Sequence, residues 1–414
     1  MFFGSTVIQS FLIIIAIFSV LFWILPRRFN WISFAVLTFL LSYMAFKIVP
    51  NISDDLFRYY NVINSLRAGG WNKMREFIEN NLMDMGDYFT IRYLFWIVSR
   101  TQNNHWLQTI VIAFVYGSSS IMILLAQRRF DINKGYVYLG TLFFLSTYWY
   151  FDTASGIRNG LCFAIIVFCS YIMFVEKRFI PLCIIGYIIG FYTHSAGLLA
   201  IALVVVTAIL YRIDSVFINF VFMFSLIGGN FLIQTFAENS NNSLLLSIAG
   251  RAEQHVGGDT IGTDINFIVN IVTVLTVIII AIFLNYYLKD RTPSNDTSVF
   301  SKYVSLTMYF TVGSIFSGLI FMRFVRWIVP ILGGLILMIG LQRQEERISE
   351  KGEIYYKYYA IPIERFLFNV KPILILMVFM YSVVHLWYDY SGSSLTFAHF
   401  GYEWEAMGIY DYTW

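Results

Sequence analysis

Apolar segments separated by short polar connections recur from the first residues of the chain to about residue 386. A helix that crosses a bilayer needs roughly 20 predominantly apolar residues. The pattern therefore predicts an all-α, polytopic integral membrane protein with about 12 transmembrane helices. The predicted spans are Thr6–Leu25, Trp31–Val49, Trp106–Ala126, Tyr136–Phe151, Ile157–Val175, Ile180–Tyr192, Ser195–Tyr211, Val216–Phe236, Ile265–Leu288, Tyr303–Phe321, Phe324–Leu341 and Phe366–Leu386. The first continues past signal-peptide length without a small-residue cleavage site, so we expect a retained anchor.

Basic residues follow alternate spans, which is typical of cytoplasmic connections. The clusters are Arg27 and Arg28, then Arg128, Arg129 and Lys134, then Lys177 and Arg178, then Arg212, then Lys289 and Arg291, and last the run from Arg343 to Lys371. Both termini are then outside. We expect one integral domain, 1–414, with outer loops at about 50–105 and 237–264 and a cytoplasmic loop at about 342–365. In the first outer loop, Asn72–Asn81 is predicted to be helical and Tyr88–Ser99 to be a short amphipathic or re-entrant helix.

The segments Ile180–Tyr192 and Ser195–Tyr211 are together too long for one helix and individually short for two spans. Basic residues flank both ends of the pair, which predicts a hairpin with His194 at its tip. At 1.5 Å per residue, the shorter arm reaches only about 20 Å into a hydrocarbon core about 30 Å thick. We therefore expect His194 below the outer surface, in a water-filled cavity.

Composition excludes several classes of protein. Hydrophobic residues make up 58% of the chain and charged residues 13%, and the mean hydropathy is +0.68, which is too apolar for a soluble globule. The three cysteines lie in apolar runs, so no disulfide framework is predicted. No metal-binding motif and no nucleotide-binding glycine loop is found. We expect no metal or other cofactor and no nucleic-acid partner, and we expect the glycines of LIGGN (Leu226–Asn230) and ILGGL (Ile331–Leu335) to pack helices together.

The segment NISDDLFRYY, Asn51–Tyr60, places two carboxylates, an arginine and two tyrosines directly after the second span. Charge this dense beside a bilayer predicts a polar ligand at the membrane surface. The predicted topology leaves nine arginines outside, against the positive-inside rule: Arg58, Arg67, Arg75, Arg92, Arg100, Arg158, Arg251, Arg323 and Arg326. Guanidinium groups match phosphate oxygens, so these arginines indicate a lipid phosphate or diphosphate. The alternative, favoured for Arg67, Arg75 and Arg100, is that they anchor helices to headgroups or pair with local acids.

Four short motifs occur in the order seen in EpsG-like proteins: SDDLFRYY at residues 53–60, IRNGLCFAI at 157–165, THSAGLLAI at 193–201 and RFVRWIVP at 323–330. The chain resembles this family, which includes Wzy-type O-antigen and exopolysaccharide polymerases, from about the second span to the penultimate one. The resemblance implies a glycosyltransferase of GT-C-type architecture with periplasmic loop helices. Its location would be the bacterial inner (plasma) membrane, with the active site facing the periplasm.

By the same resemblance, the donor and the acceptor are oligosaccharide repeat units carried on undecaprenyl diphosphate. The enzyme would transfer glycan from undecaprenyl diphosphate to the non-reducing end of a lipid-linked repeat unit. Membrane lipids surround the enzyme, and a chain-length regulator is a further candidate partner.

Such a reaction needs cations for the leaving diphosphate and a proton acceptor for the attacking hydroxyl. The expected diphosphate clamp is Arg58, Arg158 and Arg323, with Arg326 and Arg92 as second choices. The candidates for the proton acceptor are Asp54, Asp55 and His194. In the alternative, Asp55 only fixes Arg58 in an ion pair and His194 takes the proton. Tyr59 and Tyr60 are candidates for stacking on sugar rings.

Two other functions fit the same features. An O-antigen ligase uses the same donor but transfers the glycan to lipid A core, and it would share the arginines. A lipid-linked oligosaccharide flippase would also carry arginines in its cavity and about 12 spans, but it needs no large outer loop. Alternating access usually goes with repeat symmetry, which this sequence lacks.

Overall fold

A computed structural model describes residues 6–48, 55–79, 88–213, 217–224, 298–316 and 318–358, together with the single residues 50, 275 and 278. The described residues form helices and no strand. In chain order the helices are α1 (Thr6–Ile24), η1 (Arg27–Phe29), α2 (Asn30–Phe46), α3 (Asp55–Glu79), α4 (Phe89–Ser99), α5 (Trp106–Arg129), α6 (Lys134–Thr147), α7 (Tyr150–Ser155), α8 (Ile157–Tyr171), η3 (Ile172–Glu176), α9 (Ile180–Phe191), α10 (Gly197–Leu210), α14 (Ser298–Gly313), η4 (Ser314–Phe316), α15 (Gly318–Trp327) and α16 (Val329–Tyr358).

Three segments of the described chain are long and apolar enough to cross a membrane: Arg27–Phe46, Trp106–Arg129 and Ile157–Glu176. A fourth is the bent pair formed by Ile320–Trp327 and Val329–Arg343, if that pair makes one span. Shorter apolar helices accompany them, among them α9 and α10. The prediction of an all-helical chain with apolar, membrane-length helices is therefore confirmed at this level. The predicted spans at 265–288 and 366–386, and most of the one at 216–236, lie outside the described residues.

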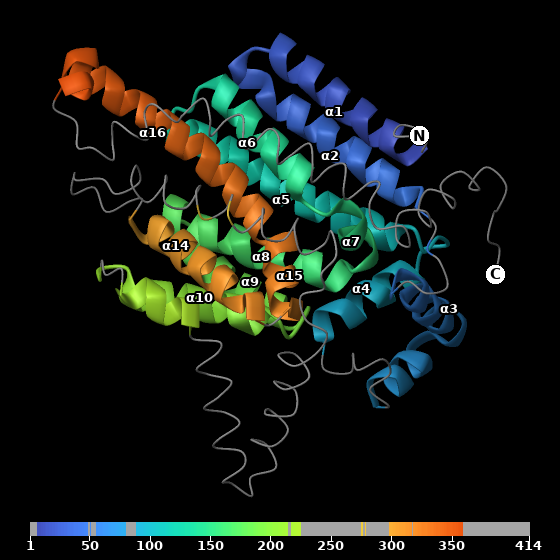
Figure 1. The fold of residues 1–414 in the computed structure, drawn as a ribbon. Helices are drawn as coiled ribbons and strands as arrows, with labels where there is room; N and C mark the ends of the chain where they lie inside the picture. The colour runs from blue at the N-terminus through green and yellow to red at the C-terminus, as the bar shows by residue number, and fades with distance from the viewer. Residues whose placement is uncertain are drawn as a thin grey trace, which may run out of the picture.

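The helices pack side by side in one bundle. α2 packs between α1 and α5, α8 packs between α5 and α9, and α16 packs along α6. Figure 1 shows α1 and α2 on one side of this bundle and α9 and α10 on the opposite side. Large apolar side chains on both outer sides are exposed, including Ile13 and Val20 of α1 and Leu182 and Ile188 of α9. Apolar surface of this extent is suited to contact with lipid rather than water.

Glycines allow the backbones of α6 and α16 to approach each other closely. A Cβ atom built on Gly140 would lie 2.5 Å from the carbonyl oxygen of Gly334, and one on Gly334 would lie 2.6 Å from the carbonyl oxygen of Gly140. Neither backbone can move away without separating the helices. The expectation that the ILGGL glycines pack helices is confirmed, whereas LIGGN lies outside the described residues.

The predicted hairpin is also confirmed. α9 and α10 are joined by the short turn that contains His194. Two backbone hydrogen bonds close this turn. The N–H of His194 donates to the carbonyl oxygen of Gly190 (3.2 Å), and the N–H of Gly197 donates to the carbonyl oxygen of His194 (2.9 Å). A Cβ atom on Gly197 would lie 3.2 Å from the carbonyl oxygen of Gly190. The turn therefore has no room for a larger side chain there.

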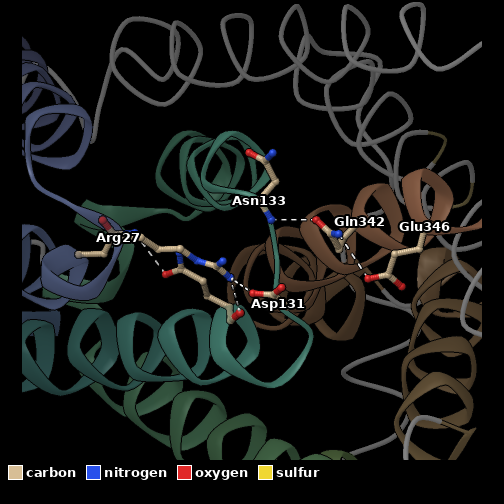
Figure 2. A network of polar contacts seen from close by, with 7 residues as sticks. Arg27, Asp131, Asn133, Gln342 and Glu346 are labelled. Carbon is tan, nitrogen blue, oxygen red and sulfur yellow. Dashed lines mark hydrogen bonds and ion pairs between the residues drawn. The ribbon is translucent and has the colours of Figure 1, made fainter. Parts of the chain in front are cut away.

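Polar contacts tie the helices together at the end of the bundle where α5 finishes. Arg27 pairs with Asp131 at 2.7 Å, the backbone N–H of Asn133 donates to Gln342 Oε1 at 2.8 Å, and Gln342 donates on to Glu346, as Figure 2 shows. The other end of α5 meets α3 and α4. With 24 residues, α5 is about 36 Å long, so its two ends are separated by about that distance. The end with these polar contacts also carries Arg28, Arg128 and Arg129.

One predicted boundary is wrong. We expected one span to end at Phe321 and the next to begin at Phe324, with the break at Arg323. In the structure, Arg323 and Arg326 both lie within α15, and the bend of 45° follows them, between Trp327 and Val329. α15 folds back so that Phe324 lies against Phe310 of α14, with ring centroids 5.0 Å apart. The segment is apolar apart from these two arginines, so hydropathy places the break at Arg323 and not after Trp327.

Candidate functional site

Five side chains from five parts of the chain meet at the end of the bundle opposite the Arg27 network. Arg158 is the second residue of α8, Arg323 lies in α15, and His194 lies in the turn between α9 and α10. Tyr59 of α3 and Tyr88, which directly precedes α4, complete the group. We call these five residues the outer cationic cluster.

Arg158 is held between the two tyrosines. Its Nε donates a hydrogen bond to the hydroxyl oxygen of Tyr59 at 3.2 Å. The carbon at the centre of its guanidinium group lies 6.0 Å from the ring centroid of Tyr59 and 5.7 Å from that of Tyr88. Burial raises the pKa of Tyr59, against the opposing charge of Arg158, so this phenol stays neutral. Because one nitrogen and both neighbouring rings fix the group, its remaining N–H donors have a defined direction.

His194 is buried, with 6% of its surface exposed. Its Nδ1 accepts a hydrogen bond from the backbone N–H of Ala196 at 2.9 Å, so the neutral ring carries its proton on Nε2. Burial, followed by the positive charges of Arg323 and Arg158, lowers the pKa of this residue to about 3. The ring stacks on Tyr88 at 6.2 Å. We infer that His194 presents a fixed N–H donor, which is the opposite of the proton-accepting role considered from sequence.

Arg323 adds a second positive charge close to the first. Its charge and that of Arg158 act on His194 and on each other. Within the described ranges, no carboxylate lies at ion-pair distance from Arg158 or Arg323. Two half-buried guanidinium groups that repel one another, with no described carboxylate beside them, form an arrangement that an anion would stabilise.

Arg326, one turn further along α15, has a different environment. It pairs with Asp152 of α7 at 2.6 Å, and both side chains are mostly buried. Its guanidinium group also lies over the ring of Trp149 at 4.2 Å, while Trp327 donates a hydrogen bond to Thr153. These contacts neutralise Arg326 and fix α15 against α7, which directly precedes α8. Arg326 therefore positions Arg323, and the structure does not bring it into the cluster.

Arg58 is paired as well, as one of the two alternatives anticipated. Its Nη1 lies 3.5 Å from Asp55 Oδ1, with 61% and 50% of the two side chains exposed. The charges of Asp55 and Arg58 both act on Tyr59, so the pair borders the cluster on its outer side. An exposed pair of this kind is weak and can exchange its partner for a ligand.

The remaining predicted site residues lie elsewhere or outside the described residues. The hydroxyl group of Tyr60 is hydrogen-bonded to Gln108 of α5, which turns it away from the cluster. Arg92 lies on α4, one turn after Tyr88, and its Nε is buried without a hydrogen-bond partner. Asp54 is outside the described residues.

Two features of the site were not found from the sequence. Asp152, the partner of Arg326, was given no role from the sequence. It lies six positions before Arg158, in the segment FDTASGIR. Tyr88 was not among the predicted site residues. In both cases the partner is distant in the sequence, and no local pattern marks the contact.

Arg67 and Arg100, for which a structural role was favoured, have one. Arg67 donates to the side chains of Asn64 (2.8 Å) and Asn104 (2.6 Å), and Arg100 donates to the carbonyl oxygen of Leu66 (2.8 Å). These bonds join α3 to the end of α4 and the loop after it.

Within the described ranges, no group of three histidine, cysteine or acidic side chains is placed to hold a metal ion. No protein-family model, no curated protein and no solved structure matches this chain. The case for a function therefore depends on the cluster itself.

Proposed function

We propose that this protein is a membrane glycosyltransferase that binds a polyprenyl diphosphate donor at the outer cationic cluster. The observation that carries the proposal is the pair Arg158 and Arg323, which have no acidic partner in the described part of the chain, next to the N–H donor of His194. Of the other described arginines at this end, Arg58 and Arg326 pair with an acid and Arg67 and Arg100 are hydrogen-bonded to the protein, whereas the buried Nε of Arg92 has no hydrogen-bond partner. Arg158 and Arg323 lie in the cluster itself, and no described carboxylate neutralises their charge, which is available for a ligand.

A diphosphate is the anion whose chemistry fits best. Its charge increases as the bond from the sugar C1 to the diphosphate oxygen breaks, so cations already in place stabilise the transition state more than the ground state. Arg158 and Arg323 supply that charge, and Nε2–H of His194 donates to a phosphate oxygen. The acceptor hydroxyl oxygen forms the new bond to C1, the diphosphate leaves with the electron pair, and the hydroxyl proton passes to a base.

Asp55 is the described carboxylate best placed to accept that proton. It is exposed, it borders the cluster through Tyr59, and within the described part of the chain it pairs with Arg58 at 3.5 Å. Asp54 stays a candidate from the sequence. His194 is less suited, since its Nδ1 is already bonded to the backbone and its Nε2 carries the proton.

The wider assignment follows from the resemblance to EpsG-like and Wzy-type proteins. It comprises about 12 transmembrane helices, GT-C-type architecture, a place in the bacterial inner membrane and an active site that faces the periplasm. Polymerisation of undecaprenyl-diphosphate-linked repeat units is the activity that agrees with these features. The position of the cluster at the end opposite the basic residues supports an outward-facing site.

The proposal is tested with purified protein in detergent and lipid-linked repeat units extracted from cells that lack it. Longer lipid-linked glycans and released undecaprenyl diphosphate are expected, and a flippase would produce neither because no compartments are present. Arg158→Ala and Arg323→Ala should abolish elongation, whereas Arg178→Ala, an exposed arginine at the opposite end, should not. Full elongation by well-folded Arg158→Ala protein would refute the proposal.

A further inference from the structure

α4 has one buried and one exposed face. Ile91, Phe95 and Val98 are buried against the bundle, whereas Phe89, Tyr93 and Ile97 are 47%, 43% and 57% exposed. The exposed residues are four apart, so they form a continuous stripe along the helix. With 11 residues, α4 is about 16 Å long, too short to cross a bilayer.

The exposed stripe of α4 continues onto α9. The backbone N–H of Thr90 donates to the carbonyl oxygen of Tyr192 at 3.2 Å. The hydroxyl group of Thr90 donates to the carbonyl oxygen of Ile189 at 3.1 Å. The rings of Phe89 and Tyr192 are in contact at 6.2 Å. On α9, exposed Ile188 and Ile185 extend the same apolar surface away from the turn.

This apolar surface begins next to the outer cationic cluster. Tyr88, which stacks on His194 and borders Arg158, is the residue before Phe89. Tyr192 is two residues before His194. If a ligand binds the cluster with an anionic head, the part of the ligand next to that head therefore lies over Phe89 and Tyr192.

We propose that the exposed stripes of α4 and α9 bind the isoprenoid chain of the lipid diphosphate whose head binds the outer cationic cluster. This inference rests on the proposed function, because it takes the ligand to be a polyprenyl diphosphate. Charge at one end and continuous apolar surface at the other match that amphipathic molecule. The isoprenoid chain stays in contact with lipid while the diphosphate reaches Arg158 and Arg323. The substrate therefore enters laterally from the bilayer, along the exposed face of α4.

The test uses the photoreactive residue p-benzoylphenylalanine in the full-length protein, placed at Tyr93 of α4 or Ile188 of α9. Matched controls carry it at Ile13 or Val20 of α1, which are as exposed (57% each) and lie on the other side of the bundle (Figure 1). The protein is held in phosphatidylglycerol nanodiscs, and the probe is tritium-labelled undecaprenyl diphosphate. All four positions face outward, so the substitutions leave the packing of the bundle intact.

Saturable labelling is expected at α4 and α9, several-fold above that at α1. Excess unlabelled undecaprenyl diphosphate should abolish it, and undecaprenol should compete at least tenfold less well because it lacks the charged head. The Arg158→Ala variant should lose the saturable part. Equal labelling of α1, equal competition by undecaprenol, or cross-linking of α4 to a second copy of the chain would each overturn the proposal. Saturable labelling by a protein that transfers no glycan would retain this inference while refuting the transferase activity.

Discussion

Replacing Arg323 by alanine is expected to weaken diphosphate binding without weakening the fold. Arg323 has no ion pair in the described part of the chain, and its charge is repelled by that of Arg158. Removing one of two like charges relieves this repulsion, and the gain offsets the lost packing of the side-chain stem. The thermal midpoint of unfolding should therefore be unchanged or higher.

The expected loss of affinity follows from the bond that is removed. A hydrogen bond to a charged group contributes about 1.5–3 kcal/mol, and about 1.4 kcal/mol corresponds to a tenfold change in an equilibrium constant. The Kd for diphosphate should rise about 10- to 150-fold in Arg323→Ala. Arg323→Lys keeps the charge but loses the planar fork, so its Kd should lie between those of the wild type and Arg323→Ala.

Arg326→Ala is the matched control, one turn away on the same helix. Arg326 pairs with Asp152 at 2.6 Å and packs on Trp149, so its removal leaves a mostly buried carboxylate alone. Breaking a fully buried pair costs about 3–5 kcal/mol, and the partial exposure reduces this to about 1–3 kcal/mol. Stability should fall, and diphosphate affinity should change less than in Arg323→Ala.

The assay is titration calorimetry of the detergent-purified variants with inorganic diphosphate, together with thermal unfolding of the same samples. The two variants should separate: Arg323→Ala loses affinity and keeps its stability, and Arg326→Ala does the reverse. The reasoning is refuted if Arg323→Ala binds diphosphate with wild-type affinity. It is also refuted if Arg323→Ala loses as much stability as Arg326→Ala.

Three further predictions concern stability and binding. Because burial lowers the pKa of His194 below that of an unfolded histidine, unfolding takes up a proton below about pH 6.5; the thermal midpoint should fall from pH 7 to pH 5 more steeply in the wild type than in His194→Gln, and parallel slopes would contradict this. Tyr59→Phe removes the oxygen that orients Arg158 and should raise the calorimetric Kd for diphosphate about fivefold, for about 1 kcal/mol; an unchanged Kd would show that this bond does not orient the guanidinium group. Gly334→Ala forces a Cβ atom onto a backbone carbonyl of α6 and should cost about 1–3 kcal/mol in unfolding, whereas Gly117→Ala, which meets only an ordinary contact at 3.7 Å, should be tolerated in the same thermal assay.

Several features of the fold could be predicted because their cause is local. The hairpin of α9 and α10 follows from basic residues at both outer ends of two short apolar segments, and α4 follows from an amphipathic run of residues. The bend after Trp327 could not be predicted. A segment of given composition has the same mean hydropathy whether the helix runs straight, bends or folds back.

The sequence by itself determined that the chain contains apolar helices of membrane length and that basic residues follow alternate apolar segments, because burial in lipid depends on the composition of each segment. It also supplied nine outer arginines, and it ranked Arg326 only behind Arg58, Arg158 and Arg323 as a diphosphate ligand. Only the tertiary structure decided that Arg326 meets Asp152 while Arg158 and Arg323 meet no described carboxylate. The physical reason is that the effect of a charge depends on which groups lie within a few ångströms of it, and here those groups come from helices far apart in the chain.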